Sequence, residues 1–263
     1  MDLLPTDTPL AIEIAGLSKH FGPLTAVDSL NLQVLEGECF GFLGPNGAGK
    51  TTTLNMLTTL LKPSAGRVKI CGFDLESEVT EIKRHIGLMP DNPTIYQSLT
   101  GRQFIYFVSS LYGLKKTKID ELAIYYLDLL DILSTFDDPI KSYSFGMQKK
   151  ILLVSVLVRQ PKVLFLDEPT VGLDPKSANT VKNILRQLCA SGRTIFMTSH
   201  MLQMVEQVCD RIGIIQNGKL ITTGTLTDLR TRSNDISSLE DIFLQLTNGL
   251  DSVSYTHLTL PTT

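Results

Sequence analysis

The amino-acid sequence predicts an α/β fold with a mostly parallel central sheet. Short continuous apolar runs, such as residues 163–166, are typical of strands that are covered on both faces. A glycine-rich loop at 44–49 joins one such run to a segment with helical character. The stretch at roughly 90–160 is helix-like, and we interpret it as a helical sub-domain inserted into the core.

The expected elements follow in order along the chain. Leu30, Leu32 and Val34 alternate with polar residues, so residues 10–35 should form antiparallel strands, an N-terminal β sub-domain. A buried strand at 39–43, a helix at 52–61 and a strand at 67–71 come next. Helices are expected at 104–111, 119–133 and 149–158, and strands at 163–166, 194–198 and 212–215. Asn217 and Gly218 indicate a hairpin turn, and a short last helix should begin at Ser238.

Composition and charge exclude several classes of protein. The 263 residues are 43% hydrophobic and 19% charged, as in ordinary globular proteins. A net charge of −3 argues against nucleic acid as the main partner. The most apolar stretch, 151–158, is far shorter than the ~20 residues of a membrane span. We expect no signal peptide, because the first residues show neither a basic start nor an apolar run.

The four cysteines are scattered along the sequence and form no C-x-x-C pair. They are Cys39, Cys71, Cys189 and Cys209. This pattern favours reduced core thiols over a metal site or a disulfide framework.

Residues 44–51 read GPNGAGKT, the phosphate-binding pattern G-x-x-x-x-G-K-T of the P-loop NTPases. Glycines allow backbone N–H groups to turn inward around phosphate oxygens, and the following helix adds its positive dipole end. Lys50 supplies a cation for the outer phosphates, and the Thr51 hydroxyl is a candidate Mg²⁺ ligand. The candidate phosphate-binding residues are Gly44, Pro45, Asn46, Gly47, Ala48, Gly49, Lys50, Thr51 and Thr52.

Two carboxylates end the apolar run at 163–166. Asp167 is expected to reach Mg²⁺ from a strand beside the P-loop. Glu168 lies one residue further, where a general base would take a proton from an attacking water. An apolar strand ending in two acids is weak evidence alone, but it becomes strong after a P-loop.

The order of motifs resembles the ATP-binding subunits of ABC transporters, from about residue 10 to residue 247. Residues 143–148, YSFGMQ, resemble the family signature L-S-G-G-Q, which points to Ser144 and Gly146 as nucleotide contacts. Residues 172–175, GLDP, resemble the D-loop, and residues 198–200, TSH, the segment of the switch histidine. Phe21 stands where an aromatic residue usually stacks on adenine.

Each of these residues also has a plain structural interpretation. Phe21 could be a core aromatic, and His200 could lie at a helix start and bond only to the backbone. Ser144 could be a helix N-cap and nothing more. Asp174 with Pro175 could be a simple turn. The order and spacing of the motifs favour the functional interpretation.

The sequence departs from the family pattern at several positions. Phe145 replaces the first glycine of the signature, and Met147 replaces its glutamine. The resulting Y-S-x-G-M core and the ending at 238–243 are similar to one branch, whose members pair with separate six-helix exporter permeases. Lys150 stands where the family often has arginine. Asp91 replaces the usual Q-loop glutamine; we expect it to help to hold Mg²⁺, and a surface turn at 90–93 is the alternative.

The resemblance implies an ATPase that binds ATP and Mg²⁺, with Lys50, Glu168 and His200 as catalytic residues. It implies a head-to-tail homodimer with two ATPs between the protomers. It also implies a membrane permease as partner, so the chain would lie peripherally on the cytoplasmic face of the cell membrane. The alternatives are a soluble ABC ATPase outside transport and a regulatory module with little hydrolysis.

We assign residues 1–251 to one ABC ATP-binding domain. The threonine-rich segment 252–263 shows no continuity with it and resembles translated sequencing-adapter read-through. We therefore expect this segment to be a non-native or weakly ordered tail.

Overall fold

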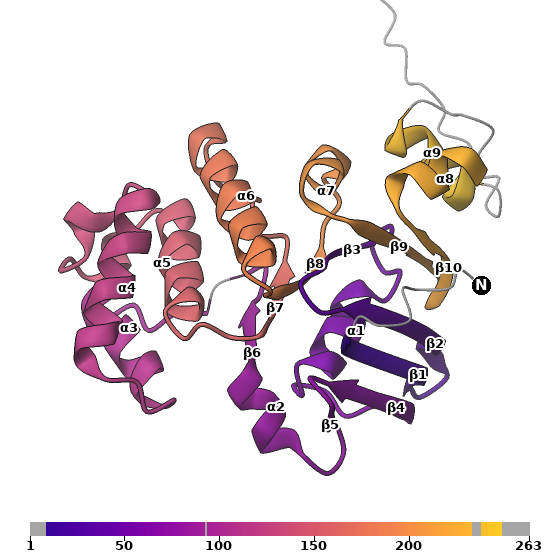
Figure 1. Ribbon diagram of the computed structural model, residues 1–263, viewed down its shortest axis with the longest axis horizontal. Helices are drawn as coiled ribbons and strands as arrows, with labels where there is room; N and C mark the ends of the chain where they lie inside the picture. The colour runs from indigo at the N-terminus through magenta and orange to yellow at the C-terminus, as the bar shows by residue number, and fades with distance from the viewer. Residues whose placement is uncertain (1–8, 93, 233–237, 249–263) are drawn as a thin grey trace, which may run out of the picture.

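The computed structural model describes residues 9–92, 94–232 and 238–248, which form two sheets and their covering helices (Figure 1). One sheet is antiparallel and has four strands in the order β2-β1-β4-β5. Its strands are β1 (Leu10–Phe21), β2 (Leu24–Leu35), β4 (Ala65–Ile70) and β5 (Phe73–Asp74). This is the N-terminal β sub-domain that the alternation at 30–34 predicts.

The second sheet has six strands in the order β10-β9-β3-β8-β7-β6. Five strands run parallel, and β10 pairs antiparallel with β9 at one edge. The strands are β3 (Cys39–Leu43), β6 (Ile86–Met89), β7 (Val163–Asp167), β8 (Thr194–Thr198), β9 (Arg211–Gln216) and β10 (Lys219–Gly224). Every residue of β3, β7 and β8 is buried, as their continuous apolar sequences require.

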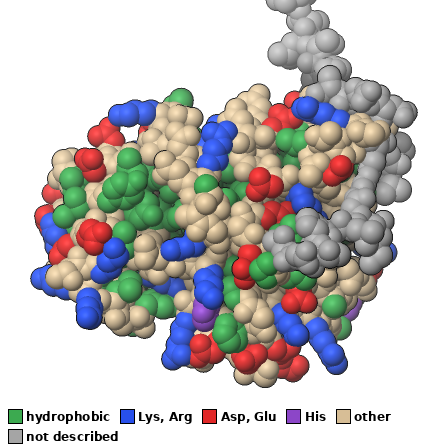
Figure 2. Space-filling model, viewed as in Figure 1, with side chains coloured by type: hydrophobic (Ala, Val, Ile, Leu, Met, Phe, Trp, Pro, Cys, Tyr) green, Lys and Arg blue, Asp and Glu red, His purple; other side chains and the backbone are tan. Residues whose placement is uncertain are grey.

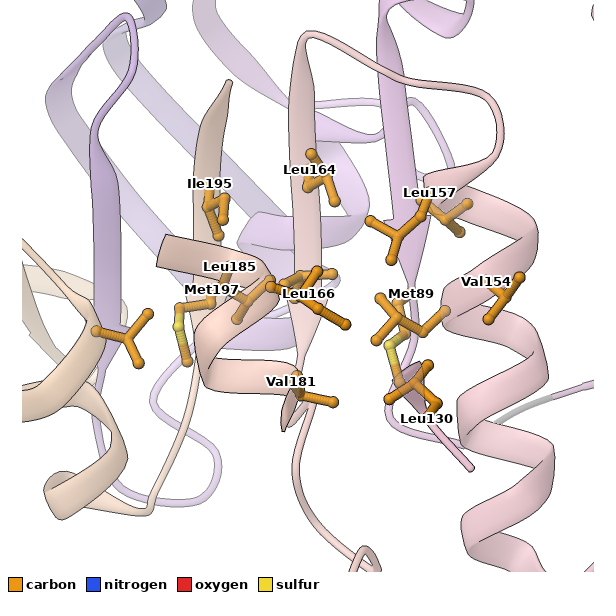
Figure 3. Close-up of a cluster of buried hydrophobic side chains, with 14 of the residues drawn as sticks. Met89, Leu130, Val154, Leu157, Leu164, Leu166, Val181, Leu185, Ile195 and Met197 are labelled. Carbon is orange, nitrogen blue, oxygen red and sulfur yellow. The ribbon is translucent and has the colours of Figure 1, made fainter. Parts of the chain in front are cut away.

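Helices cover both faces of the six-stranded sheet. Helix α1 (Lys50–Leu57) packs in the core between the two sheets. Alternate residues of β7 point to opposite faces: Phe165 joins that core, whereas Leu164 and Leu166 join the core on the other side. Figure 3 shows this second core, in which residues of β7 and β8 meet α6 (Pro175–Ala190) and α5 (Phe145–Leu157).

The helical part lies between β6 and β7 and sits at one end of the molecule (Figure 1). Its α-helices are α3 (Gly101–Ser110), α4 (Lys116–Leu129) and α5. The expected α/β fold, with a parallel core sheet, a β sub-domain and an inserted helical sub-domain, is therefore confirmed. Helix α3 begins with a capping box, in which Thr100 and Gln103 each accept a backbone N–H of the other.

The structure adds helices that the sequence patterns did not indicate. They are α2 (Val79–His85), α6, α7 (Leu202–Val208) and α8 (Leu226–Arg232). The expected hairpin is present, with Asn217 and Gly218 at φ values of 49° and 77° between β9 and β10. The last helix, α9 (Leu239–Asn248), begins after Ser238 as expected. The tail at 252–263 lies outside the described residues.

All four cysteines are free thiols, as the spacing predicts. Three of them are not scattered in space, because the Cys39 and Cys209 sulfurs lie 3.8 Å apart and Cys189 joins them. The hydrogen bond with the Cys39 thiol, and after it burial, raise the pKa of Cys189. Within the part of the chain that the structure describes, no helix is long and apolar enough to cross a membrane.

Candidate functional site

The glycine-rich loop runs from the end of β3 into the first turn of α1. Gly49 precedes the helix at φ 108°, and a Cβ there would lie 2.6 Å from the carbonyl oxygen of Ala26. Only glycine combines this backbone angle with so close a neighbour. Gly49 therefore allows the sharp turn into α1. This turn directs the free N–H groups of the first helical turn toward the space enclosed by the loop.

Lys50 curls back over the loop. Its Nζ donates to the carbonyl oxygens of Gly44 at 2.6 Å and Pro45 at 3.0 Å. Burial lowers the pKa of this ammonium, and the nearby carboxylates of Glu168 and Asp167 oppose that shift. The P-loop lysine thus has two acidic neighbours from a distant part of the sequence.

Asp167 ends β7 and meets the first turn of α1. The Thr51 hydroxyl lies 3.3 Å from its Oδ2, and the Thr198 hydroxyl donates to its Oδ1. Its strand is not paired with the P-loop strand itself, because β8 lies between β3 and β7. Asp167 still reaches Thr51, since α1 packs across the sheet above β7.

Glu168 is held by the loop that follows β8. The Nδ1 of His200 donates to its Oε1 at 2.7 Å, and the Ser199 hydroxyl donates to its Oε2 at 3.2 Å. The Glu168 side chain is only 13% exposed, whereas that of His200 is 62% exposed. The interpretation of His200 as a residue bonded only to the backbone is therefore wrong. Glu168 also has a positive φ of 49°, an uncommon conformation for a residue other than glycine.

A cavity of about 320 Å³ opens beside these groups. It is lined by Gly44, Pro45, Asn46, Ser199, His200, Leu202 and Phe243. Phe243 comes from α9; its segment resembles one branch of the family, but the sequence did not indicate that Phe243 lines the site. A larger hollow of about 530 Å³ between the end of α1, β4 and α2 is lined by other residues, so it is separate from this site.

The signature residues lie at the start of α5. Ser144 caps the helix and accepts the N–H of Met147 at 3.3 Å. The structure therefore confirms Ser144 as an N-cap, and its contact with nucleotide stays a prediction. Within the described residues, no hydrogen bond or ion pair joins Ser144 or Gly146 to the P-loop. The Phe145 ring is 45% exposed and covers Gly172, where a Cβ would approach it to 2.6 Å.

Phe21 ends β1 and is 47% exposed, so it is not the core aromatic of the plain interpretation. The ammonium of Lys19 lies 5.2 Å from its ring centroid. An exposed ring beside a cation is compatible with stacking on a base. Its role in adenine binding stays a prediction.

Asp91 has a partner that the sequence did not indicate. The Nζ of Lys149 lies 3.1 Å from its Oδ1 and 2.8 Å from the carbonyl oxygen of Glu168. Asp91 is therefore more than a residue of a surface turn. Lys149 follows the signature directly, and this position is the only sequence signal that could have singled it out.

A P-loop facing a carboxylate pair, a hydroxyl and a histidine defines a nucleotide-hydrolysing enzyme of the P-loop class. Comparisons with known proteins give the family. Residues 27–171 match the family model described as ABC transporter. The chain belongs to the ABC transporter family, and it is an ATP-binding subunit with ATPase activity. Its relatives do not favour the alternative of an ABC ATPase outside transport.

Two curated relatives and one solved structure cover most of the chain. The uncharacterized ABC transporter ATP-binding protein YhcH of Bacillus subtilis is 39% identical over 85% of this chain and 73% of its own length. The linearmycin resistance ATP-binding protein LnrL of the same organism is 35% identical over 90% of this chain and 74% of its own length. A solved ATP-binding subunit of an ABC transporter has a TM-score of 0.86 at 26% identity, covering 90% of this chain and 99% of that chain.

Proposed function

We propose that this chain powers export through a separate membrane permease, and that hydrolysis occurs where Glu168, His200, Asp167 and Thr51 converge beside the P-loop. The contact between His200 and Glu168 carries this proposal, because it places a base held by an oriented partner beside a phosphate-binding loop. Residues 1–251 would form one ATP-binding domain around this site.

The residues at the end of β7 fit an ATP-bound Mg²⁺. Thr51 and Asp167 present oxygen ligands 3.3 Å apart, and Mg²⁺ prefers hard oxygens in an octahedral set. The described residues contain no group of three or more His, Cys, Asp or Glu that could hold a metal, so phosphate oxygens and water would complete the shell. Asp91 is the third candidate ligand. The ion would neutralise charge on the phosphates.

The roles of the other groups follow from their positions. The N–H groups at 44–52 and the Lys50 ammonium would bind the phosphates, and Phe21 would stack on adenine. Glu168 would take the proton of the attacking water. His200 would hold the Glu168 carboxylate through the bond from its Nδ1 and leave its exposed Nε2 side facing the outer phosphate.

A homodimer would complete each site. Ser144 and Gly146 have no bonded contact with their own P-loop among the described residues, so they are free to serve a partner protomer. The start of α5 offers N–H groups and a positive dipole end to a γ-phosphate. ATP would join the two protomers, and hydrolysis would release them.

An integral-membrane permease is the other proposed partner. Exposed apolar side chains of the helical part include Phe107, Leu111 and Tyr112, and Figure 2 shows hydrophobic side chains gathered over this part. Such a patch is typical of a protein-binding surface. This chain would then lie peripherally on the cytoplasmic face of the membrane. A net charge of −3 supports a partner other than nucleic acid.

The relative LnrL carries the description of linearmycin resistance, and it supports a drug as the exported substrate. The test is a pull-down of an integral-membrane partner with this chain, followed by reconstitution with the permease it recovers. ATPase activity of the chain should rise when that permease is present in proteoliposomes, and the Glu168→Gln variant should remove the increase. A chain that hydrolyses ATP but neither binds nor responds to the permease would contradict the transport role.

A further inference from the structure

Lys149 is a buried cation beside the proposed site that the proposed mechanism does not use. It lies in α5, and its side chain is 0% exposed. Burying an ammonium group is costly unless charge and hydrogen bonds compensate it. Its Nζ has two such partners, the carbonyl oxygen of Glu168 at 2.8 Å and the carboxylate of Asp91 at 3.1 Å. The centroid of the Phe145 ring lies 5.6 Å from the Lys149 Nζ.

These contacts join three separate segments at one ammonium. Asp91 follows β6, Glu168 follows β7, and Lys149 belongs to the inserted helical part. Strands β6 and β7 are neighbours in the sheet, so the two loops leave the same edge side by side. Lys149 ties both loops to α5 at that edge.

Glu168 needs such a fixation for a physical reason. Its backbone adopts a positive φ of 49°, which a residue other than glycine keeps only where its surroundings hold it. Its side chain is fixed by His200 and Ser199, and its carbonyl oxygen is fixed by Lys149. Without the ammonium, that carbonyl would lose its shorter hydrogen bond and keep only the one from the Val171 N–H at 3.3 Å, so the peptide after Glu168 would be held less firmly.

We propose that Lys149 is a positioning residue for hydrolysis: its ammonium, held by Asp91, fixes the backbone of Glu168 so that the carboxylate faces the attacking water. This inference rests on the proposed role of Glu168 as the general base. The Asp91 carboxylate accepts from the buried ammonium at 3.1 Å and helps to keep it directed at the Glu168 carbonyl. Asp91 is 40% exposed, so the pair connects the inside of the site to its surface.

The central experiment compares three lysine variants by ATPase kinetics at saturating Mg²⁺. Lys149→Met removes the charge and both hydrogen bonds at similar volume. We expect kcat to fall roughly 10- to 100-fold, because small displacements of a reacting group cost about that much, while KM and the affinity for ATP stay within about twofold. Lys149→Gln keeps an N–H donor for the Glu168 carbonyl, so it should recover a large part of the rate. Lys118→Met is the matched control, since Lys118 pairs only with Glu121 on the surface of α4, and its kcat should be unchanged.

Two further variants separate positioning from a general loss of structure. Asp91→Asn keeps an oxygen that accepts from Lys149, so at saturating Mg²⁺ its loss of kcat should be smaller than that of Lys149→Met. In the Glu168→Gln background, Lys149→Met should cause no further loss of the residual rate, because there is no base left to position. A purely structural lysine would instead reduce the residual rate in that background by the same factor. Thermal melting of each variant identifies any that fails to fold, and Lys149→Gln then decides in place of Lys149→Met.

The outcomes also distinguish the two proposals. If Glu168→Gln keeps wild-type turnover, the base is misassigned, whatever Lys149 does. If Glu168→Gln is inactive and Lys149→Met keeps kcat within twofold of wild type, the positioning role of Lys149 is wrong and the base assignment stands. An equal change of KM and kcat in Lys149→Met would also overturn the positioning role.

Discussion

The Nδ1 of His200 donates to the Oε1 of Glu168 at 2.7 Å, although 32 positions separate the two residues in the sequence. The contact exists because β7 and β8 are parallel neighbours, so the loops at their carboxyl ends start side by side. The carboxylate is mostly buried and the imidazole mostly exposed. Glu168 is therefore held on the inner side of the pair, and His200 is the part of the pair that faces solvent.

Replacing Glu168 by glutamine should separate hydrolysis from binding. The amide keeps an acceptor for His200 but cannot take a proton, so turnover should fall roughly 10²- to 10⁴-fold. ATP should still bind. An ATP-bound dimer should accumulate, because without hydrolysis the two protomers cannot separate. Single-turnover hydrolysis and gel filtration with ATP measure both effects.

A matched control for this variant is Glu81→Gln, which removes a carboxylate from the exposed pair with Arg84 in α2. It should leave turnover unchanged, because a surface pair contributes little. Near wild-type hydrolysis by Glu168→Gln would refute the assignment of the base.

Lys50→Ala should lose affinity as well as rate. The Lys50 ammonium lies inside the loop, 2.6 Å from the Gly44 carbonyl oxygen, and its charge would serve bound ATP and the transition state alike. Titration with a fluorescent ATP analogue should show weaker binding than in wild type, whereas Glu168→Gln should bind normally. Unchanged nucleotide affinity in Lys50→Ala would argue against this role.

The dimer model predicts complementation between two inactive chains. Ser144→Arg blocks the signature, and Lys50→Ala disables the P-loop, so each homodimer should be inactive. A mixed dimer contains one site with an intact P-loop and an intact signature, and it should regain part of the ATPase activity. Mixing the purified variants and measuring hydrolysis tests this, and full activity of the Ser144→Arg homodimer would rule out the sandwich arrangement.

The sequence predicted the features that depend on local pattern. Short stretches of sequence with few alternative interpretations encode the P-loop, the acids after the apolar run 163–166 and the hairpin at Asn217. Helix α6 was missed although it carries a clear start signal, with Asp174 as N-cap and Pro175 in its first turn. In the sequence these residues resemble the D-loop, and a simple turn is their plain alternative, so neither interpretation indicated a helix start.

The features that could not be predicted from the sequence depend on contacts between distant segments. Nothing near Asp91 in the sequence indicates Lys149, which is 58 positions away. The three clustered cysteines and Phe243 at the cavity are similar cases, because only the packing of α6, α7 and α9 brings them to their places. The order of strands was also hidden, since β8 lies between β3 and β7 but follows both in the chain.

Asp174 should make stability depend on pH at the acid end. Its carboxylate accepts the hydroxyl of Ser177 at 2.5 Å and the N–H of Ser177 at 2.9 Å, and these bonds lower its pKa from 3.8 to about 2. A carboxyl with a lowered pKa in the fold stabilises the folded state above pH 3.8, and this contribution is lost as pH falls toward about 2. Asp174→Ala should therefore have a lower melting temperature than wild type at pH 6, and the difference should shrink at pH 3. A difference that stays constant or grows on acidification would contradict the assignment, and Asp174→Asn, which keeps the cap, should lose only the pH-dependent part.

Asp91 should reveal its role in the Mg²⁺ dependence of hydrolysis. One carboxylate oxygen accepts from Lys149 at 3.1 Å, which leaves the second oxygen for a cation bound with ATP. If that oxygen helps to hold Mg²⁺, Asp91→Ala should raise the Mg²⁺ concentration that gives half-maximal ATPase activity. Asp91→Gln should restore most of the rate, because the longer amide brings a neutral oxygen to the same region. The measurement is a Mg²⁺ titration at saturating ATP, with Asp138→Ala as the control on the helical part. Should Asp91→Ala lower kcat while the half-maximal Mg²⁺ concentration stays at the wild-type value, Asp91 acts only through Lys149, and the metal role is wrong.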